Sequence, residues 1–149
     1  MMKPDYDHCC FIVQDINKSI QFYRDVIGLE YIEGPIEMGE GSGVDTIVGY
    51  SNAHIKRAGL RLSDSCWLEL IQYIVPSGLK TAVNERCDVG SAHIAFWVDD
   101  LTKDYQELTG KGVRFVSPPS RTSTGLLVTY CFDPDGFILE LKERRKPKQ

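Results

Sequence analysis

Residues 90–101 read GSAHIAFWVDDL, and this stretch decides the fold. His93 leads an apolar run that ends at Val98, and Asp99 and Asp100 follow directly. Carboxylates suit a helix N-terminus because they accept the unpaired backbone amide hydrogens there. The stretch therefore predicts a buried strand that runs into a helix, with one histidine near its start. Taken alone, such a histidine is most often a core residue whose ring is satisfied by a backbone carbonyl.

A second copy of this pattern changes that interpretation. Residues 7–16 read DHCCFIVQDI, and residues 28–32 (GLEYI) fall beside residues 112–116 (GVRFV) once the two helices are passed. The first segment aligns with the later one as His8 on His93, Val13 on Val98, Asp15 on Asp100 and Ile16 on Leu101. An internal repeat of this kind indicates two copies of one supersecondary unit. The two histidines are then related by pseudo-symmetry and could meet at one centre.

Each repeat also places one carboxylate in an apolar strand. Residues 66–74 read CWLELIQYI and contain Glu69, while the final strand FILEL contains Glu140. Side chains alternate between the faces of a strand, so either face surrounds these glutamates with apolar neighbours. A buried, unpaired carboxylate is costly, and it therefore has to be exposed at an edge, paired, or bound to a cation.

The remaining elements follow from periodicity and turn signals. After the first strand we expect a helix over 17–27, closed by Gly28, and after the second repeat's strand a helix over 102–111. Residues 33–43 are predicted as a loop, either a cover over a site or a plain surface connection. We expect strands over 29–32, 55–62, 66–74, 112–116, 125–132 and 137–141, and a short helical turn over 44–48.

These elements predict an α+β fold. Two βαβββ modules would form a curved, mostly antiparallel eight-stranded sheet around a metal-binding cleft. We expect one domain over 1–149, with module 1 at about 5–75, a linker at about 76–89, module 2 at about 90–142 and a basic tail over 143–149.

The candidate metal ligands are His8, Glu69, His93 and Glu140. Two imidazoles and two carboxylates suit one divalent ion per site, and zinc, nickel, cobalt, manganese and iron(II) all remain open.

Composition excludes several other classes of protein. The 149 residues carry a formal net charge of −4, so the chain has no excess of positive charge that would attract nucleic acid or an anionic membrane. We expect no membrane span and no signal peptide, and therefore a cytoplasmic protein. The five cysteines form no CxxC pair and are interpreted as structural.

The chain resembles the vicinal oxygen chelate superfamily, which includes glyoxalase I, methylmalonyl-CoA epimerase, extradiol dioxygenases and bleomycin-binding proteins. The matching motifs are DHCCFIVQDINKSIQFYRDVIGLE, WLELIQY, GSAHIAFWVDDL and DPDGFILEL. The resemblance implies paired βαβββ modules and puts the family's metal positions on His8, Glu69, His93 and Glu140. A glutamate at the second position is more like glyoxalase I and the epimerase. No glutathione-binding signature is visible, and residues 33–57 match neither enzyme closely.

Glyoxalase I and the epimerase share the removal of a proton alpha to a carbonyl, so the resemblance implies a metal-dependent lyase or isomerase. Its substrate would be a small carbonyl compound or thioester. Glu140 is the first candidate for the catalytic base and Glu69 the second. We also expect a homodimer, because a small open sheet leaves edges and apolar surface to cover. The alternatives are a non-catalytic binding or resistance protein, with Trp67, Trp97 and Tyr130 lining its cleft, and a ring-cleaving dioxygenase.

Overall fold

The computed structural model describes residues 5–78 and 85–145. The contacts within the chain divide it into two units, residues 1–81 and 82–149, and each unit is described by itself. Each unit is built around a four-stranded mixed sheet with helices, so the α+β fold of βαβββ modules is confirmed. Most of the expected linker, over residues 79–84, and the end of the basic tail, over 146–149, lie outside the described residues.

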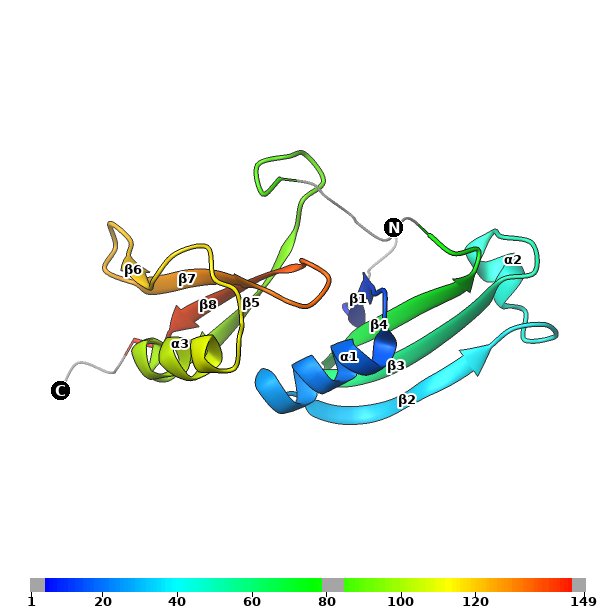
Figure 1. The fold of residues 1–149 in the computed structure, drawn as a ribbon, viewed down its shortest axis with the longest axis horizontal. Coiled ribbons are helices and arrows are strands. Elements are labelled where there is room, and N and C mark those ends of the chain that lie inside the picture. Colours follow the sequence, from blue (N-terminus) through cyan, green and yellow to red (C-terminus); the bar gives the residue numbers. More distant parts are fainter. Residues whose placement is uncertain (1–4, 79–84, 146–149) are drawn as a thin grey trace. The chain divides into compact units, whose positions relative to one another are not determined.

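The first unit has the strand order β1-β4-β3-β2. Strand β1 pairs parallel with β4, and the other two pairings are antiparallel. Figure 1 shows α1 lying along one face of this sheet. The elements are β1 (His8–Ile12), α1 (Ile16–Gln21) with a π-helical continuation (Phe22–Val26), β2 (Glu30–Met38), α2 (Val44–Val48), β3 (His54–Ser63) and β4 (Cys66–Val75).

The second unit repeats this topology with the order β5-β8-β7-β6. Strand β5 pairs parallel with β8, as β1 does with β4, and α3 covers one face of the sheet (Figure 1). The elements are β5 (His93–Val98), α3 (Leu101–Gly110), β6 (Ser120–Arg121), β7 (Leu127–Phe132) and β8 (Ile138–Glu143).

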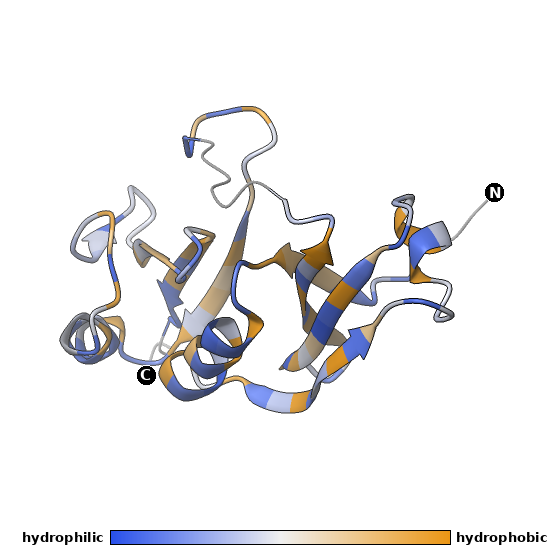
Figure 2. Cartoon of the chain, turned by 45° about the vertical axis from the view of Figure 1, so that its right-hand side comes forward, coloured by the Kyte–Doolittle hydropathy of each residue, from blue (hydrophilic) through white to orange (hydrophobic). Residues whose placement is uncertain are grey.

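The core of each unit lies between its sheet and its longer helix. In β4, Leu68 and Leu70 are fully buried and point to the side of α1, which contacts this strand. In β8, Leu139 and Leu141 occupy the corresponding positions. Figure 2 shows the resulting alternation of hydrophilic and hydrophobic residues along strands of the first unit. Because burying each leucine contributes roughly 1.5–3 kcal/mol, these residues fix which face of each strand turns inward. The glutamates between them consequently lie on the opposite face.

The predicted helix N-caps are confirmed. Asp15 accepts the amides of Asn17 and Lys18, and Asp100 accepts the amide of Lys103. The first turn of each helix also donates a backbone amide to a second side-chain acceptor, which the sequence reasoning did not find. In each repeat this acceptor lies three residues after the glutamate. These acceptors are Gln72, which receives the amide of Ile16, and Glu143, which receives the amide of Leu101. The last strand of each module is thereby tied to the start of its helix.

Two predicted segments differ in the structure. Strand β2 continues through residues 33–38, which we expected to be loop because residues 33–43 are rich in Gly, Glu and Pro. Because β2 is an edge strand, it accommodates these residues through register shifts in its pairing with β3. In the second unit, the expected strand over 112–116 is reduced to a single bridge between Phe115 and Cys131. Strand β6 pairs with the first residues of β7, and residues 114–116 bond to its last residues along the same edge.

Among the described residues no helix is long and apolar enough to cross a membrane. All five cysteines are free thiols, as the interpretation of them as structural residues requires.

Candidate functional site: a histidine–glutamate pair in each module

In the first unit, His8 and Glu69 lie on neighbouring parallel strands. Glu69 on β4 is opposite Cys10 on β1, so His8 and Glu69 share one face of the sheet. His8 Nε2 lies 3.4 Å from Glu69 Oε2. The glutamate side chain is only 14% exposed, whereas the imidazole remains 35% exposed. The carboxylate is therefore shielded while the histidine stays accessible.

The second unit contains the equivalent pair. Glu140 on β8 is opposite Ala95 on β5, two residues after His93, which is the same offset as in the first unit. His93 Nε2 lies 3.4 Å from Glu140 Oε2, and the Glu140 side chain is again 14% exposed. The structure thus brings each predicted histidine together with the glutamate of its own repeat. The meeting of the two pairs at one centre stays a prediction.

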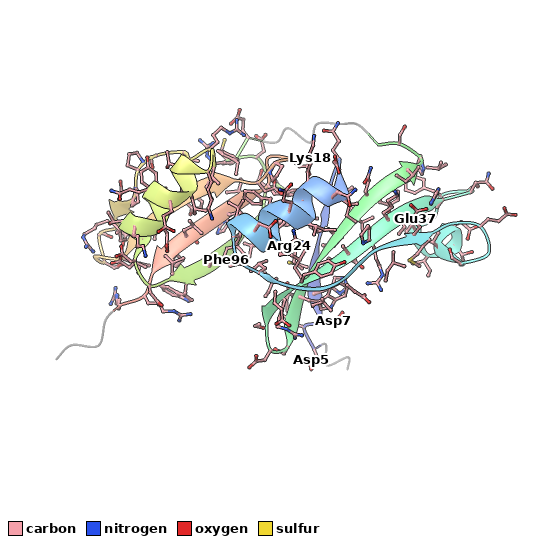
Figure 3. All side chains as sticks on the ribbon, turned by 60° about the horizontal axis from the view of Figure 1, so that its bottom comes forward. Asp5, Asp7, Lys18, Arg24, Glu37 and Phe96 are labelled. Carbon is pink, nitrogen blue, oxygen red and sulfur yellow. The ribbon has the colours of Figure 1, made fainter. Side chains whose placement is uncertain are left out.

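The first pair has a feature that bears directly on cation binding. His8 Nδ1 donates to Asp7 Oδ2 at 2.6 Å, and this hydrogen bond lowers the pKa of Asp7 below its usual value. Asp7 lies at the start of β1 (Figure 3). Because Nδ1 carries the hydrogen in this contact, Nε2 of a neutral ring presents a lone pair to the Glu69 oxygen. Two acceptors facing each other need a cation between them, either a proton or a metal ion.

Such a pair fits a divalent metal by its donor chemistry, because imidazole nitrogen and carboxylate oxygen are both common ligands of borderline ions. A carboxylate behind the ring, as Asp7 is behind His8, is the usual arrangement around a metal-bound histidine. Within residues 5–78 and 85–145, no three side chains of His, Cys, Asp or Glu form a group that could hold a metal ion. Each unit by itself brings two of the four candidate ligands together.

The two glutamates differ in their second neighbours. Glu69 Oε1 lies 3.9 Å from an Arg57 guanidinium nitrogen, and Arg57 also pairs with Glu33 at 2.7 Å. The Arg57 guanidinium lies over the Trp67 ring at 5.8 Å. The sequence reasoning missed Arg57, although its position in β3 opposite Ile71 places it on the face of Glu69. The Glu69 carboxylate thus lies between the His8 imidazole and the Arg57 guanidinium.

Glu140 instead has a hydroxyl as its second neighbour. Tyr130 on β7 donates to Glu140 Oε1 at 3.4 Å, and its ring meets His93 edge-on at 5.6 Å. Burial, together with the charge of Glu140, raises the pKa of Tyr130. This tyrosine therefore remains a hydrogen-bond donor at neutral pH.

The aromatic residues proposed for a cleft have different surroundings. Trp67 lies beside His8, with ring centroids 4.7 Å apart, and Tyr130 lies beside His93. Trp97 is 49% exposed and carries the Lys142 ammonium 4.8 Å from its ring centre. The remaining histidine, His54, belongs to neither pair and lies 3.4 Å from Glu37 near the α2 end of β2, where Figure 3 labels Glu37.

Helix α2 closes one end of the face that carries Glu69. Val44, Ala53 and Ile55 form a buried cluster against which Ile71 and Tyr73 pack. Ile71 and Tyr73 follow Glu69 on the same face of β4, because they are two and four residues further along. The segment expected to be either a cover or a plain connection is therefore followed by a helix packed on the sheet face that carries Glu69.

Comparison with known proteins identifies the class. The chain belongs to the Glyoxalase/Bleomycin resistance protein/Dioxygenase superfamily, whose family model matches residues 5–141. A glyoxalase family protein from Bacillus cereus has the same fold, with a TM-score of 0.81 at 22% identity, covering 96% of this chain and 97% of that chain.

Among curated relatives, the uncharacterized protein YwkD of Bacillus subtilis is 31% identical, covering 97% of this chain and all of the relative. A probable lactoylglutathione lyase of Synechocystis is 25% identical, covering 95% of this chain and 96% of the relative. A 2-epi-5-epi-valiolone epimerase of an Actinomyces species is 26% identical, covering 90% of this chain and 76% of the relative. Relatives of this chain thus include proteins named as a lyase and as an epimerase.

Proposed function

We propose that this protein is a divalent-metal-dependent enzyme that removes a proton alpha to a carbonyl group. The observation that supports it most strongly is the recurrence of one His–Glu pair, at the same strand offset and the same 3.4 Å separation, in both modules. In this proposal His8, Glu69, His93 and Glu140 together would hold one ion, with two ligands from each module. A glutamate that leaves the ion on substrate binding would open a position for the carbonyl oxygen. The two modules pair within one chain or across a homodimer.

Each residue has a distinct role in the proposed reaction. When bound, a divalent ion would supply Lewis-acid polarisation of the substrate carbonyl. His8 and His93 would bind through Nε2, and Asp7 would keep the His8 ring in the required orientation. Glu69 would stay in place because Arg57 holds its second oxygen by charge. Glu140 would take the proton, because its second neighbour is a rotatable tyrosine hydroxyl that lets the carboxylate turn toward the substrate.

The metal assignment has a direct test. Protein purified without chelator should contain about one divalent ion per four-ligand site by elemental analysis. His93→Ala should lower metal affinity sharply, whereas His54→Ala, the matched control outside both pairs, should leave it unchanged. Metal-free protein that takes up none of zinc, nickel, cobalt, manganese or iron(II) would refute the site and support a non-catalytic binding protein instead.

The reaction class is tested by hydrogen exchange. A 2-oxoaldehyde thiol adduct and a branched acyl-CoA thioester are the first candidates, because relatives carry the names of a lyase and an epimerase. Incubation in deuterated water, followed by proton NMR, should show label at the alpha carbon. Glu140→Gln should keep the fold and much of the metal and lose exchange, because an amide does not accept the proton. Exchange at the wild-type rate in Glu140→Gln, with none in Glu69→Gln, would transfer the role of base to Glu69.

The assembly is tested separately. We propose a homodimer, because each small open sheet leaves edges to be covered. Sedimentation at micromolar concentration checks this, and a monomer would contradict it.

A further inference from the structure

Two arginines of the second unit share one aromatic ring. The Arg114 guanidinium lies 4.3 Å from the centre of the Phe132 ring, and the Arg86 guanidinium lies 6.0 Å from it. Arg86 is in the turn before β5, Arg114 follows α3, and Phe132 ends β7. We call these three residues the Phe132 cluster. Three segments far apart in the sequence thus bring two positive charges to one place.

The Phe132 cluster lies on the same face of the sheet as His93 and Glu140. Phe132 is two residues beyond Tyr130, the hydrogen-bond partner of Glu140, so both side chains point to one face. Phe132 and His93 are both opposite Ile138, from the two sides of β8. Since neighbouring strands lie about 4.8 Å apart, the backbone of Phe132 is about 10 Å from that of His93.

Both arginines are held in position by their backbone. The Arg114 carbonyl accepts the amide of Phe132 at 3.0 Å, which keeps Arg114 alongside β7. The turn around Arg86 is closed by hydrogen bonds from Ser91 Oγ to the Glu85 carbonyl and from the Glu85 amide to an Asp88 carboxylate oxygen. Asp88 is therefore engaged with the backbone of the turn.

Among the described residues, the ion pairs of this unit join His93 with Glu140, Lys103 with Glu107 and Arg144 with Asp99, and none of them includes Arg86 or Arg114. The other arginines of this unit are engaged differently: Arg121 with the Gly125 carbonyl, Arg144 with Asp99 and Arg145 with the Thr124 carbonyl. Both guanidinium groups lie beside the Phe132 ring, and an anion that reaches both would be attracted by two positive charges. A guanidinium can bind both oxygens of a carboxylate or phosphate, and the aromatic face below it fixes its orientation.

We propose that Arg86 and Arg114 bind the anionic group of the substrate, a carboxylate or phosphate. The substrate is then a carbonyl compound with an anionic group at the end that reaches the Phe132 cluster, away from the reacting carbon at the His93–Glu140 pair. This inference rests on the proposed function, because it assigns the second end of the molecule that reacts at the His93–Glu140 pair. Arg86 and Arg114 would then help to select the substrate, although neither belongs to a His–Glu pair.

The test uses the full-length, metal-free protein and two simple anions. The side-chain Nε–Hε signals of the arginines are followed by NMR during titration with succinate and, separately, with inorganic phosphate. Arg86→Gln and Arg114→Gln assign the signals and remove one contact each. Arg121→Gln is the matched control, because it removes the same charge from an arginine of the same unit that does not contact Phe132. Dimethyl succinate is the uncharged control ligand.

The Arg86 and Arg114 signals should shift together and saturate with one dissociation constant, and the stronger of the two anions identifies the substrate's charged group. Arg86→Gln and Arg114→Gln should each weaken binding at least about fivefold, since a charge-assisted hydrogen bond is lost. Arg121→Gln should leave it unchanged. The proposal is refuted if the two signals do not saturate, or if Arg121 shifts with the same dependence on anion concentration. Because neither a metal nor a reactive aldehyde, ketone or thioester is present, this result is independent of the exchange experiment.

Discussion

Replacing Glu143 tests how each module joins its last strand to its helix. Glu143 Oε2 accepts the amide of Leu101 at 3.1 Å, and Leu101 is fully buried. Glu143→Leu leaves this amide without an acceptor, which costs about 1–3 kcal/mol. Glu143→Gln keeps an oxygen acceptor and removes only the favourable charge at the N-terminus of α3, which costs about 0.3–1 kcal/mol. We therefore expect the leucine variant to lose clearly more stability than the glutamine variant.

The assay is urea unfolding of the three proteins, combined with hydrogen exchange at the Leu101 amide. The slope of the unfolding free energy with urea should stay constant while the midpoint falls. Glu107→Gln is the control, since Glu107 is an exposed residue of α3 that pairs only with Lys103 among the described ion pairs. Equal stability of Glu143→Leu and wild type, or equal losses in the leucine and glutamine variants, would refute the reasoning. Gln72→Leu should reproduce the effect at α1, where Gln72 accepts the amide of Ile16 at 3.1 Å.

Asp7→Asn should weaken metal binding by about 10–100-fold, because the carboxylate that orients the His8 ring is lost. The control Asp5→Asn should leave metal affinity unchanged, because Asp5 is an exposed neighbour whose carboxylate accepts the Tyr6 amide. Equal affinities of the two variants, measured by competition with a chromophoric chelator, would contradict this. Burial, with the charge of Asp133, raises the pKa of the Cys131 thiol to about 12, whereas an unfolded thiol ionises near pH 8.5. Because the folded state then retains the proton longer, stability should fall as pH rises from about 8.5 towards 12, by at most about 1.4 kcal/mol per pH unit. Cys131→Ala should remove this contribution from the measured slope of unfolding free energy against pH, and an unchanged slope would refute it.

Much of this fold could be predicted from local patterns in the sequence. The repeat of a histidine, an apolar run and a capping aspartate identified both modules, because a strand period of two and a helix cap are properties of neighbouring residues. The alternation of side chains along a strand also predicted that Glu69 and Glu140 face away from the leucines next to them in the sequence. Both glutamates were therefore recognisable as candidate metal ligands, and the structure places each beside the histidine of its own repeat.

Tertiary structure alone decided what depends on strand register and on distant segments. The parallel pairing of β1 with β4 and of β5 with β8 sets the equal offset of the two pairs, and no local signal specifies a register between strands so far apart. The continuation of β2 past Gly34 and Pro35 depends on its place at the sheet edge. Arg57 beside Glu69, and Arg86 with Arg114 over Phe132, are brought together by pairing across the sheet and by turns outside it. Their sequence neighbourhoods carry no motif, because the contacts that give them a role arise only when the chain has folded.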